Sequence, residues 1–218
     1  MTQCRNWGDA MYLSRVMLNT ALRETMKALV SPSLFHGAIE NSFDGDRERR
    51  LWRLDDLNAK KYVLILSETV PDLKGFAEQF GCAGEYETKD YSPLLDRISE
   101  GGTWQFRLTA NPVISKSHGK IMAHITPGFQ KKWLKSRAEK LGFSLNENEF
   151  EAMRSKWYDF HKKNGSGSSR IRFLSVTFEG ILTVKDVEQF KETLCSGIGR
   201  EKAYGQGLLT IVRGKNAE

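Results

Sequence analysis

The sequence GIGREKAYGQGLL, residues 197–209, holds four glycines around two cations, and an apolar run from Leu208 to Val212 follows it. Glycine lacks Cβ, so it adopts positive φ readily and lets another chain approach its backbone closely. A loop of this kind is suited to contact a phosphate backbone, and a tight turn leading into a last strand explains it equally well. A mononucleotide cradle is disfavoured, because no helix opens after the glycines and no P-loop Lys-Ser/Thr pair is present. The residues of this loop that are candidates to contact such a backbone are Gly197, Gly199, Arg200, Lys202, Gly205 and Gly207.

Length and hydropathy limit the class of protein. A chain of 218 residues is long enough for one large or two small domains. No apolar run approaches the ~18 residues of a membrane span, so we expect no membrane partner. Residues 1–10 lack the apolar centre of a signal peptide, and Met11 follows them, so we treat them as an N-terminal extension outside the fold.

Cysteine and histidine usage predicts a cytoplasmic protein without metal or cofactor. Cys4, Cys82 and Cys195 are odd in number and far apart, as expected of reduced thiols. The four histidines show no H-x-x-x-H or Cys-His spacing typical of a metal site.

Positive charge is concentrated in the second half of the chain. Residues 1–98 have a net charge of −2 and residues 99–218 a net charge of +8. Residues 116–172 alone hold 13 Lys and Arg against 5 Asp and Glu. A localised cationic surface indicates a nucleic-acid partner, and a solvated, solubilising face is the alternative.

The first half predicts elements in the order β-α-β-β-α-β, which is that of the ferredoxin-like fold. Ser31-Pro32 predicts a helix start, because serine is a good N-cap and proline suits the first helical position. His36 then lies in the second turn of that helix, near the positive end of its dipole. The predicted elements are strands at 12–18, 50–54, 62–67 and around Tyr86, and helices at 20–30, 32–43 and from Pro71 to about Gly81.

The second half predicts a similar, less regular series. A strand at 104–110 stops before Pro112, which cannot donate to a sheet ladder. A basic segment at 115–120 precedes a helix marked by Phe129, Trp133, Ala138 and Leu141, with lysines on its other face. We expect a second helical or irregular piece at 146–160, a flexible basic loop at 162–170, a strand or hairpin at 171–184 kinked at Glu179-Gly180, and a helix capped by Asp186. Trp104, Trp133, Phe173 and Phe178 are predicted to be core residues.

Several patterns in fixed order carry a resemblance to a known family. They are MYLSRV at 11–16, Ser31-Pro32 leading into His36, FRLTANP at 106–112, FEGILTV at 178–184 and the glycine-rich stretch at 197–209. Together they resemble the CasE family of the RAMP superfamily, the CRISPR repeat-RNA endoribonuclease subunit of type I-E Cascade. The resemblance covers about Met11 to Arg213. It implies an α+β chain of two tandem ferredoxin-like domains, at 11–98 and 99–218, in agreement with the element order.

The resemblance also implies a function and partners. Such a protein binds the hairpin of CRISPR repeat RNA, cuts at the 3′ base of its stem and stays bound to the guide RNA. Its other partners are Cascade subunits, above all the backbone subunit nearest the 3′ end of the guide. This activity belongs to antiviral defence.

A cut of this kind needs no metal, because RNA carries its own nucleophile in the 2′-OH. Histidine suits the proton transfers at neutral pH, and cations stabilise the charge that gathers on the phosphate. The candidate catalytic residues are His36, Ser33, Lys27 and Arg23. A half-buried surface histidine is the alternative for His36, but the family has its catalytic histidine at this position. The family commonly has tyrosine three residues earlier, where this chain has Ser33; Tyr12, Lys27 or Lys202 then substitutes, or cleavage is slow, or it is lost.

A hairpin stem is A-form, so we expect phosphate and shape contacts to dominate its recognition. The candidate stem-binding residues are Lys131, Lys132, Lys135, Lys162, Lys163, Arg170 and Arg172. Three hypotheses follow: a repeat-RNA endoribonuclease, a catalytically silent hairpin-binding Cascade subunit, and an unrelated ferredoxin-like RNA-binding or regulatory domain.

Overall fold

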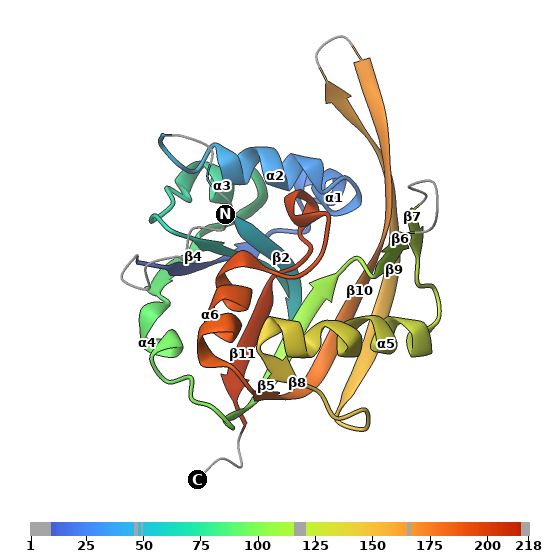
Figure 1. Ribbon diagram of the computed structural model, residues 1–218. Helices are drawn as coiled ribbons and strands as arrows, with labels where there is room; N and C mark the ends of the chain where they lie inside the picture. The colour runs from blue at the N-terminus through green and yellow to red at the C-terminus, as the bar shows by residue number, and fades with distance from the viewer. Residues whose placement is uncertain (1–9, 46–47, 49, 116–120, 165–166, 215–218) are drawn as a thin grey trace. The chain divides into compact units, whose positions relative to one another are not determined.

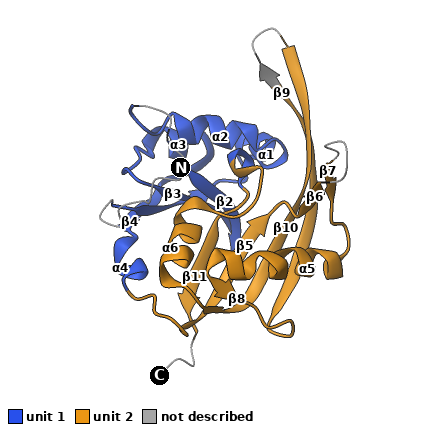
Figure 2. Cartoon of the chain, in the orientation of Figure 1, with its two compact units in different colours: residues 1–96, 203–205 blue, residues 97–202, 206–218 orange. Residues whose placement is uncertain are grey.

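The protein is described by a computed structural model, which covers residues 10–45, 48, 50–115, 121–164 and 167–214. Residues 1–9 of the predicted N-terminal extension and residues 116–120 of the basic segment at 115–120 lie outside these residues. The chain divides into two compact units, residues 1–96 with 203–205 and residues 97–202 with 206–218 (Figure 2). No helix in the described ranges is long and apolar enough to cross a membrane.

Unit 1 has the ferredoxin-like topology that its element order predicts (Figure 1). Its four strands are antiparallel in the order β2-β3-β1-β4, so β1 and β3 are the two central strands. The elements are β1 (Tyr12–Leu18), α1 (Arg23–Val30), α2 (Ser33–Glu40), β2 (Leu51–Leu57), β3 (Lys60–Ser67), α3 (Lys74–Phe80), β4 (Gly81–Asp90) and α4 (Ser92–Leu95).

Three aromatic side chains hold the helices of unit 1 on its sheet. Phe35 of α2 lies 5.9 Å from Trp52 of β2 and 5.0 Å from Phe80 of α3, measured between ring centroids, and all three are at most 1% exposed. Such rings supply most of the apolar area that a small core buries. Because Phe35 precedes His36, this packing also positions the candidate catalytic residue.

Two local predictions in unit 1 differ from the structure. The strand predicted at 50–54 is longer than expected: β2 continues to Leu57, and Asn58 and Ala59 form a two-residue hairpin turn with φ of 50° and 61°. Helix α2 is shorter than expected at both ends, because Pro32 is its N-cap and it stops at Glu40.

Unit 2 repeats the ferredoxin-like order with a longer hairpin. Its strands run β11-β5-β10, and both β8 and β9 pair with the far edge of β10. The elements are β5 (Thr103–Ala110), β6 (Val113–Ser115), β7 (Ile121–Ala123), α5 (Pro127–Ala138), η2 (Glu139–Leu141), β8 (Phe143–Ser144), β9 (Phe150–Asn164), β10 (Gly167–Val184), α6 (Val187–Ser196), η3 (Lys202–Tyr204) and β11 (Leu209–Arg213). The fold class is therefore confirmed in both units.

The core of unit 2 contains the aromatic residues predicted for it. Trp104, Trp133, Phe173 and Phe178 are all at most 4% exposed, and Trp133 of α5 stacks on Phe178 of β10. Phe129, however, is 59% exposed and stacks on His124, because it lies in the first turn of α5, and Gln130 takes the buried position.

The long hairpin corrects the predictions for residues 146–170 and confirms the strand alternative for residues 171–184. The piece at 146–160 is neither helical nor irregular, since strand β9 occupies most of it, and the basic loop at 162–170 is largely strand. Residues 171–184 belong to one strand that runs through Gly180 without a turn. Val176 is the first residue of β10 that pairs with β5. On the N-terminal side of Val176, β10 pairs with β9 and with no other described strand. We call this part, residues 156–164 and 167–175, the arm (Figure 1).

Candidate functional site

His36 lies in the first turn of α2, one residue nearer the helix start than predicted. Its backbone N donates to the carbonyl of Pro32 at 3.1 Å. Phe35 and Ile39 on the same helix are fully buried, whereas the His36 side chain is 26% exposed. The helix therefore fixes the backbone of a histidine that solvent and an RNA can reach.

A carboxylate and a buried arginine accompany His36. Nδ1 of His36 lies 3.8 Å from Oε1 of Glu40, one helical turn away. Nη1 of Arg50 donates to Oε2 of Glu40 at 3.0 Å, and the guanidinium also stacks on the Phe43 ring at 4.0 Å. The sequence analysis missed Glu40, although its i,i+4 spacing from His36 was a readable signal.

The other candidate catalytic residues of unit 1 lie on α1 and α2. Ser33 shares the first turn of α2 with His36, and its Oγ lies 3.1 Å from Oγ of Ser31. Arg23 and Lys27 are exposed one turn apart on α1, which packs against α2. Nζ of Lys27 is 3.7 Å from Oε1 of Glu24.

The lysines of α5 differ in how much of their charge they present. Lys131 is only 17% exposed, and its Nζ donates to Glu151 at 2.7 Å and to the carbonyl of Glu147 at 2.9 Å. Lys135 pairs with Glu147 at 2.9 Å, and its hydrogen bond lowers the pKa of the Glu147 carboxyl. Lys132 is exposed and forms no ion pair with any described residue, so of the three lysines its charge is the most available to a ligand.

One aspartate holds both arginines of the arm. Arg170 donates to both oxygens of Asp159, at 2.8 and 2.5 Å, and Nε of Arg172 is 3.9 Å from Oδ2 of the same carboxylate. Arg172 also lies over the ring of Trp157 at 4.8 Å, and Trp157 is 44% exposed. An exposed Trp–Arg pair is suited to contact a nucleic-acid base, and the sequence analysis missed Trp157.

The remaining basic candidates of the arm lie at its far end. Lys162 is partly exposed, and the backbone register places it opposite Ser169. Lys163 pairs in the same register with Ser168. The strands thus bring these lysines to the same hairpin as Arg170 and Arg172.

The glycine-rich loop folds back on itself. Its four glycines all have positive φ, between 72° and 94°. Ile198 N donates to Gly207 O at 2.9 Å, and Nζ of Lys202 donates to the Ser196 carbonyl at 2.7 Å. Gly205 and Gly207 are buried, and a Cβ at Gly207 would lie 2.7 Å from Ile198 O, so close packing accounts for these two. Gly199 and Arg200 are exposed, whereas Gly197 and Lys202 are partly buried.

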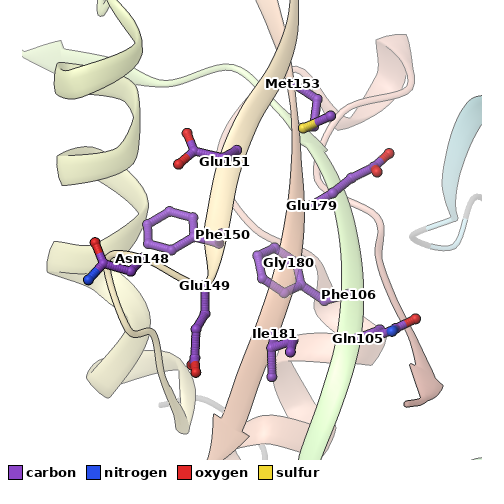
Figure 3. Close-up of a pocket in the computed structure, with 10 residues that line it drawn as sticks. All are labelled: Gln105, Phe106, Asn148, Glu149, Phe150, Glu151, Met153, Glu179, Gly180 and Ile181. Atoms are coloured by element: carbon purple, nitrogen blue, oxygen red, sulfur yellow. The ribbon is translucent and has the colours of Figure 1, made fainter. Parts of the chain in front are cut away.

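A shallow groove of about 430 Å³ on unit 2 is acidic rather than basic (Figure 3). It lies over β5, β9 and β10, with Glu149, Glu151 and Glu179 among its lining residues. Nε of Arg107 donates to Glu179 at 2.7 Å, which neutralises one carboxylate. Lys131 likewise pairs with Glu151, but the lining holds three carboxylates and no lysine or arginine, which disfavours a phosphate, so we leave this groove outside the RNA site.

Comparison with known proteins supports the same fold. A family model described as CRISPR associated protein matches residues 11–213. The CRISPR-associated endoribonuclease Cse3 of Thermus thermophilus is 32% identical over 216 residues, which cover 92% of this chain and 99% of that protein. A structure of Cse3 bound to a 19-nucleotide RNA superposes with a TM-score of 0.78 at 29% identity, covering 93% of this chain and 99% of the other.

Two further structures have the same fold. Thermus thermophilus Cse3 bound to an RNA that represents a pre-cleavage complex gives a TM-score of 0.73 at 29% identity, over 93% of this chain and 99% of that one. Cas6e of Escherichia coli K-12 gives 0.55 at 22% identity, over 93% and 99% of the two chains, and at this identity shows the fold alone. The chain therefore belongs to the CRISPR-associated protein family that contains the Cse3, or CasE, endoribonucleases.

Proposed function

We propose that this protein is a metal-independent endoribonuclease that binds the hairpin of CRISPR repeat RNA and cuts at the 3′ base of its stem. It then stays bound as the Cascade subunit that holds the 3′ end of the guide. The observation that carries the proposal is the 32% identity to the endoribonuclease Cse3 over almost both full lengths. The partly exposed His36 at the start of α2 supplies a group suited to the chemistry.

The proposed reaction breaks one P–O bond and forms another. The ribose 2′-OH loses its proton to a base and attacks the adjacent phosphorus. The 5′-oxygen leaves and takes a proton from an acid, which gives a 2′,3′-cyclic phosphate and a 5′-OH. Imidazole serves either proton transfer near neutral pH, and cations such as Arg23 and Lys27 stabilise the charge on the phosphate.

The arm and α5 are the proposed stem-binding surface. Lys132 and Lys162 are available for phosphates, Arg170 and Arg172 contribute once a phosphate displaces Asp159, and Trp157 provides an exposed aromatic face beside Arg172. Lys131 and Lys135 contribute less, because glutamates already neutralise them. Contacts between such side chains and the phosphates of the RNA recognise an A-form stem by its shape.

The test is incubation of the pure protein with its cognate repeat hairpin in EDTA, with analysis of the product ends. We expect one cut at the 3′ base of the stem and a cyclic phosphate. His36→Ala should lower the single-turnover rate by about 10² to 10⁴-fold, the usual contribution of a general acid or base. A His36→Ala protein that cuts as fast as the wild type would rule out this assignment.

Ser33 supports a second candidate, a hairpin-binding subunit with little or no activity. A serine hydroxyl is shorter than a tyrosine phenol and a poorer proton donor, since its pKa is far higher. We expect slow cleavage by the wild type and a faster rate for Ser33→Tyr under single-turnover conditions. Tight hairpin binding without any cut, in wild type and Ser33→Tyr alike, would favour the binding subunit instead.

A further inference from the structure

The Glu40 carboxylate occupies a position that its helix disfavours. Glu40 is the last residue of α2, where the partial negative charges of the final carbonyl groups collect. Its side chain is only 14% exposed, so most of its hydration is lost as well. A carboxylate in this position requires a compensating partner.

Arg50 supplies that partner and also fixes the direction of the carboxylate. Its side chain is 4% exposed and stacked on Phe43, and its Nη1 donates a hydrogen bond to Oε2 of Glu40. The other oxygen, Oε1, is then the one that lies 3.8 Å from Nδ1 of His36. The Glu40 carboxylate thus lies between the buried guanidinium of Arg50 and the solvent-accessible imidazole of His36.

The helix and Glu40 act on His36 in opposite directions. The first turn of α2 presents partial positive charge, which disfavours a protonated imidazole. The Glu40 carboxylate favours it and attracts a proton to Nδ1. The charged side chains on the helices packed against α2 are Arg23, Glu24 and Lys27 of α1 and Lys74 and Glu78 of α3, and all five are exposed. The Glu40 carboxylate contacts the ring, with Oε1 3.8 Å from Nδ1.

We propose that Glu40 is a positioning residue for the nuclease reaction: its carboxylate, 3.8 Å from Nδ1 of His36, attracts the proton to that nitrogen and leaves Nε2 to exchange protons with the RNA. Arg50 anchors Glu40 in turn. A carboxylate that orients a catalytic histidine through its second nitrogen is a recurrent arrangement in enzymes. The proposal rests on the proposed function, since it assigns a role within that reaction.

NMR titration of the His36 imidazole in the RNA-free protein tests the electrostatic link independently of cleavage. We expect Glu40→Gln to lower the titration midpoint of His36 by about one pH unit. The matched control is Glu78→Gln, which removes an exposed carboxylate from the same unit and should leave the midpoint unchanged. A shift in Glu40→Gln no larger than in Glu78→Gln would overturn the proposal.

Single-turnover cleavage as a function of pH tests the role in the reaction. The part of the pH–rate profile that reflects protonation of His36 should move to lower pH in Glu40→Gln, by the amount seen in the titration. The Kd for the hairpin should stay unchanged. The double variant Glu40→Gln/Arg50→Gln removes both charges, so it avoids an uncompensated buried arginine and should show a shift in the same direction but smaller, because the loss of the Arg50 cation favours protonation of His36. A shifted titration with an unshifted rate profile would refute the positioning role. If the wild type makes no cut, the nuclease assignment fails, while the titration still decides whether Glu40 acts on His36.

Discussion

At the scale of single residues, Asp159 is placed to compete with RNA phosphates for the two arginines of the proposed stem-binding surface. It lies between the two arginines of the arm and occupies the donors that a phosphate would need. The hydrogen bond from Arg170 lowers the pKa of the Asp159 carboxyl below 3.8, so the carboxylate stays charged throughout the neutral range. Any RNA that binds Arg170 and Arg172 must displace this pairing.

Asp159→Asn should therefore strengthen hairpin binding. We expect a decrease in Kd of about two- to fivefold, the small effect typical of an ion pair that solvent screens. The gain should be constant between pH 5 and pH 9 and vanish as pH falls through the pKa of Asp159, where the wild-type carboxyl becomes neutral. Electrophoretic mobility shift or fluorescence anisotropy measures the effect.

The matched control for Asp159 is Glu188→Gln, which removes one exposed carboxylate of α6 in the same unit. It should alter Kd by much less than Asp159→Asn. Equal effects of the two variants would mean that only net charge matters and that Asp159 does not compete locally.

The sequence identified His36, but it could not identify Arg50, the residue that pairs with the neighbouring Glu40. A position in a sequence pattern identified the histidine, whereas Arg50 lies ten residues beyond Glu40, outside any helical spacing. The two meet only because the chain returns to β2 after α2. Partners brought together by tertiary structure leave no periodic signal in one sequence.

At the scale of elements, the turn between η2 and β8 depends on one glycine. Gly142 has φ of 82°, and a Cβ there would lie 2.5 Å from Phe190 N and 2.7 Å from Asp186 O. The backbone at the start of α6 thus occupies the space that a side chain would need. Lys185 and Asp186 also donate their backbone N–H groups to the Gly142 carbonyl.

Gly142→Ala should destabilise the protein by more than ~2 kcal/mol, because strain and a backbone clash act together. The same substitution at Gly128 serves as the control. Gly128 lies in the first turn of α5, and no heavy atom lies within 4 Å of the position that an added methyl group would take, so Gly128→Ala should raise stability by about 0.5 kcal/mol. Urea unfolding measures both, and similar values for the two variants would refute the argument.

Elements with a local signal were predicted well, and those defined by distant pairing were not. β1, β5 and α6 show alternation or an N-cap, and Asp186 does accept a hydrogen bond from Gln189 N. β9 is rich in charged residues, which gives no clear strand period. Its structure comes from fourteen paired positions along β10, a constraint that its own sequence does not contain.

At the scale of the whole molecule, charge should govern RNA affinity. The chain carries a net charge of +6, and its excess of cations lies in the second half. Several of these cations already pair with carboxylates, so fewer phosphates are neutralised than a count of lysines and arginines suggests. Affinity should still fall steeply as salt rises, because bound phosphates release their counterions.

Lys132→Ala should lower the slope of log Kd against log salt concentration by about one, the effect of one lost phosphate contact. Lys185→Ala is the control, an exposed lysine of unit 2 outside the proposed surface. A slope that stays the same in Lys132→Ala, or changes equally in both variants, would remove Lys132 from the binding surface.

The continuity of β10 from the sheet into the arm limits how the arm can change length during evolution. Side chains alternate between the two faces of a strand, so an insertion of one residue would reverse every face beyond it. The same number must also enter β9 if the pairing is to be kept. We therefore expect the arms of related proteins to differ in length by two residues on each strand at a time. If the arm binds the stem, the length of stem that it covers should change in the same steps.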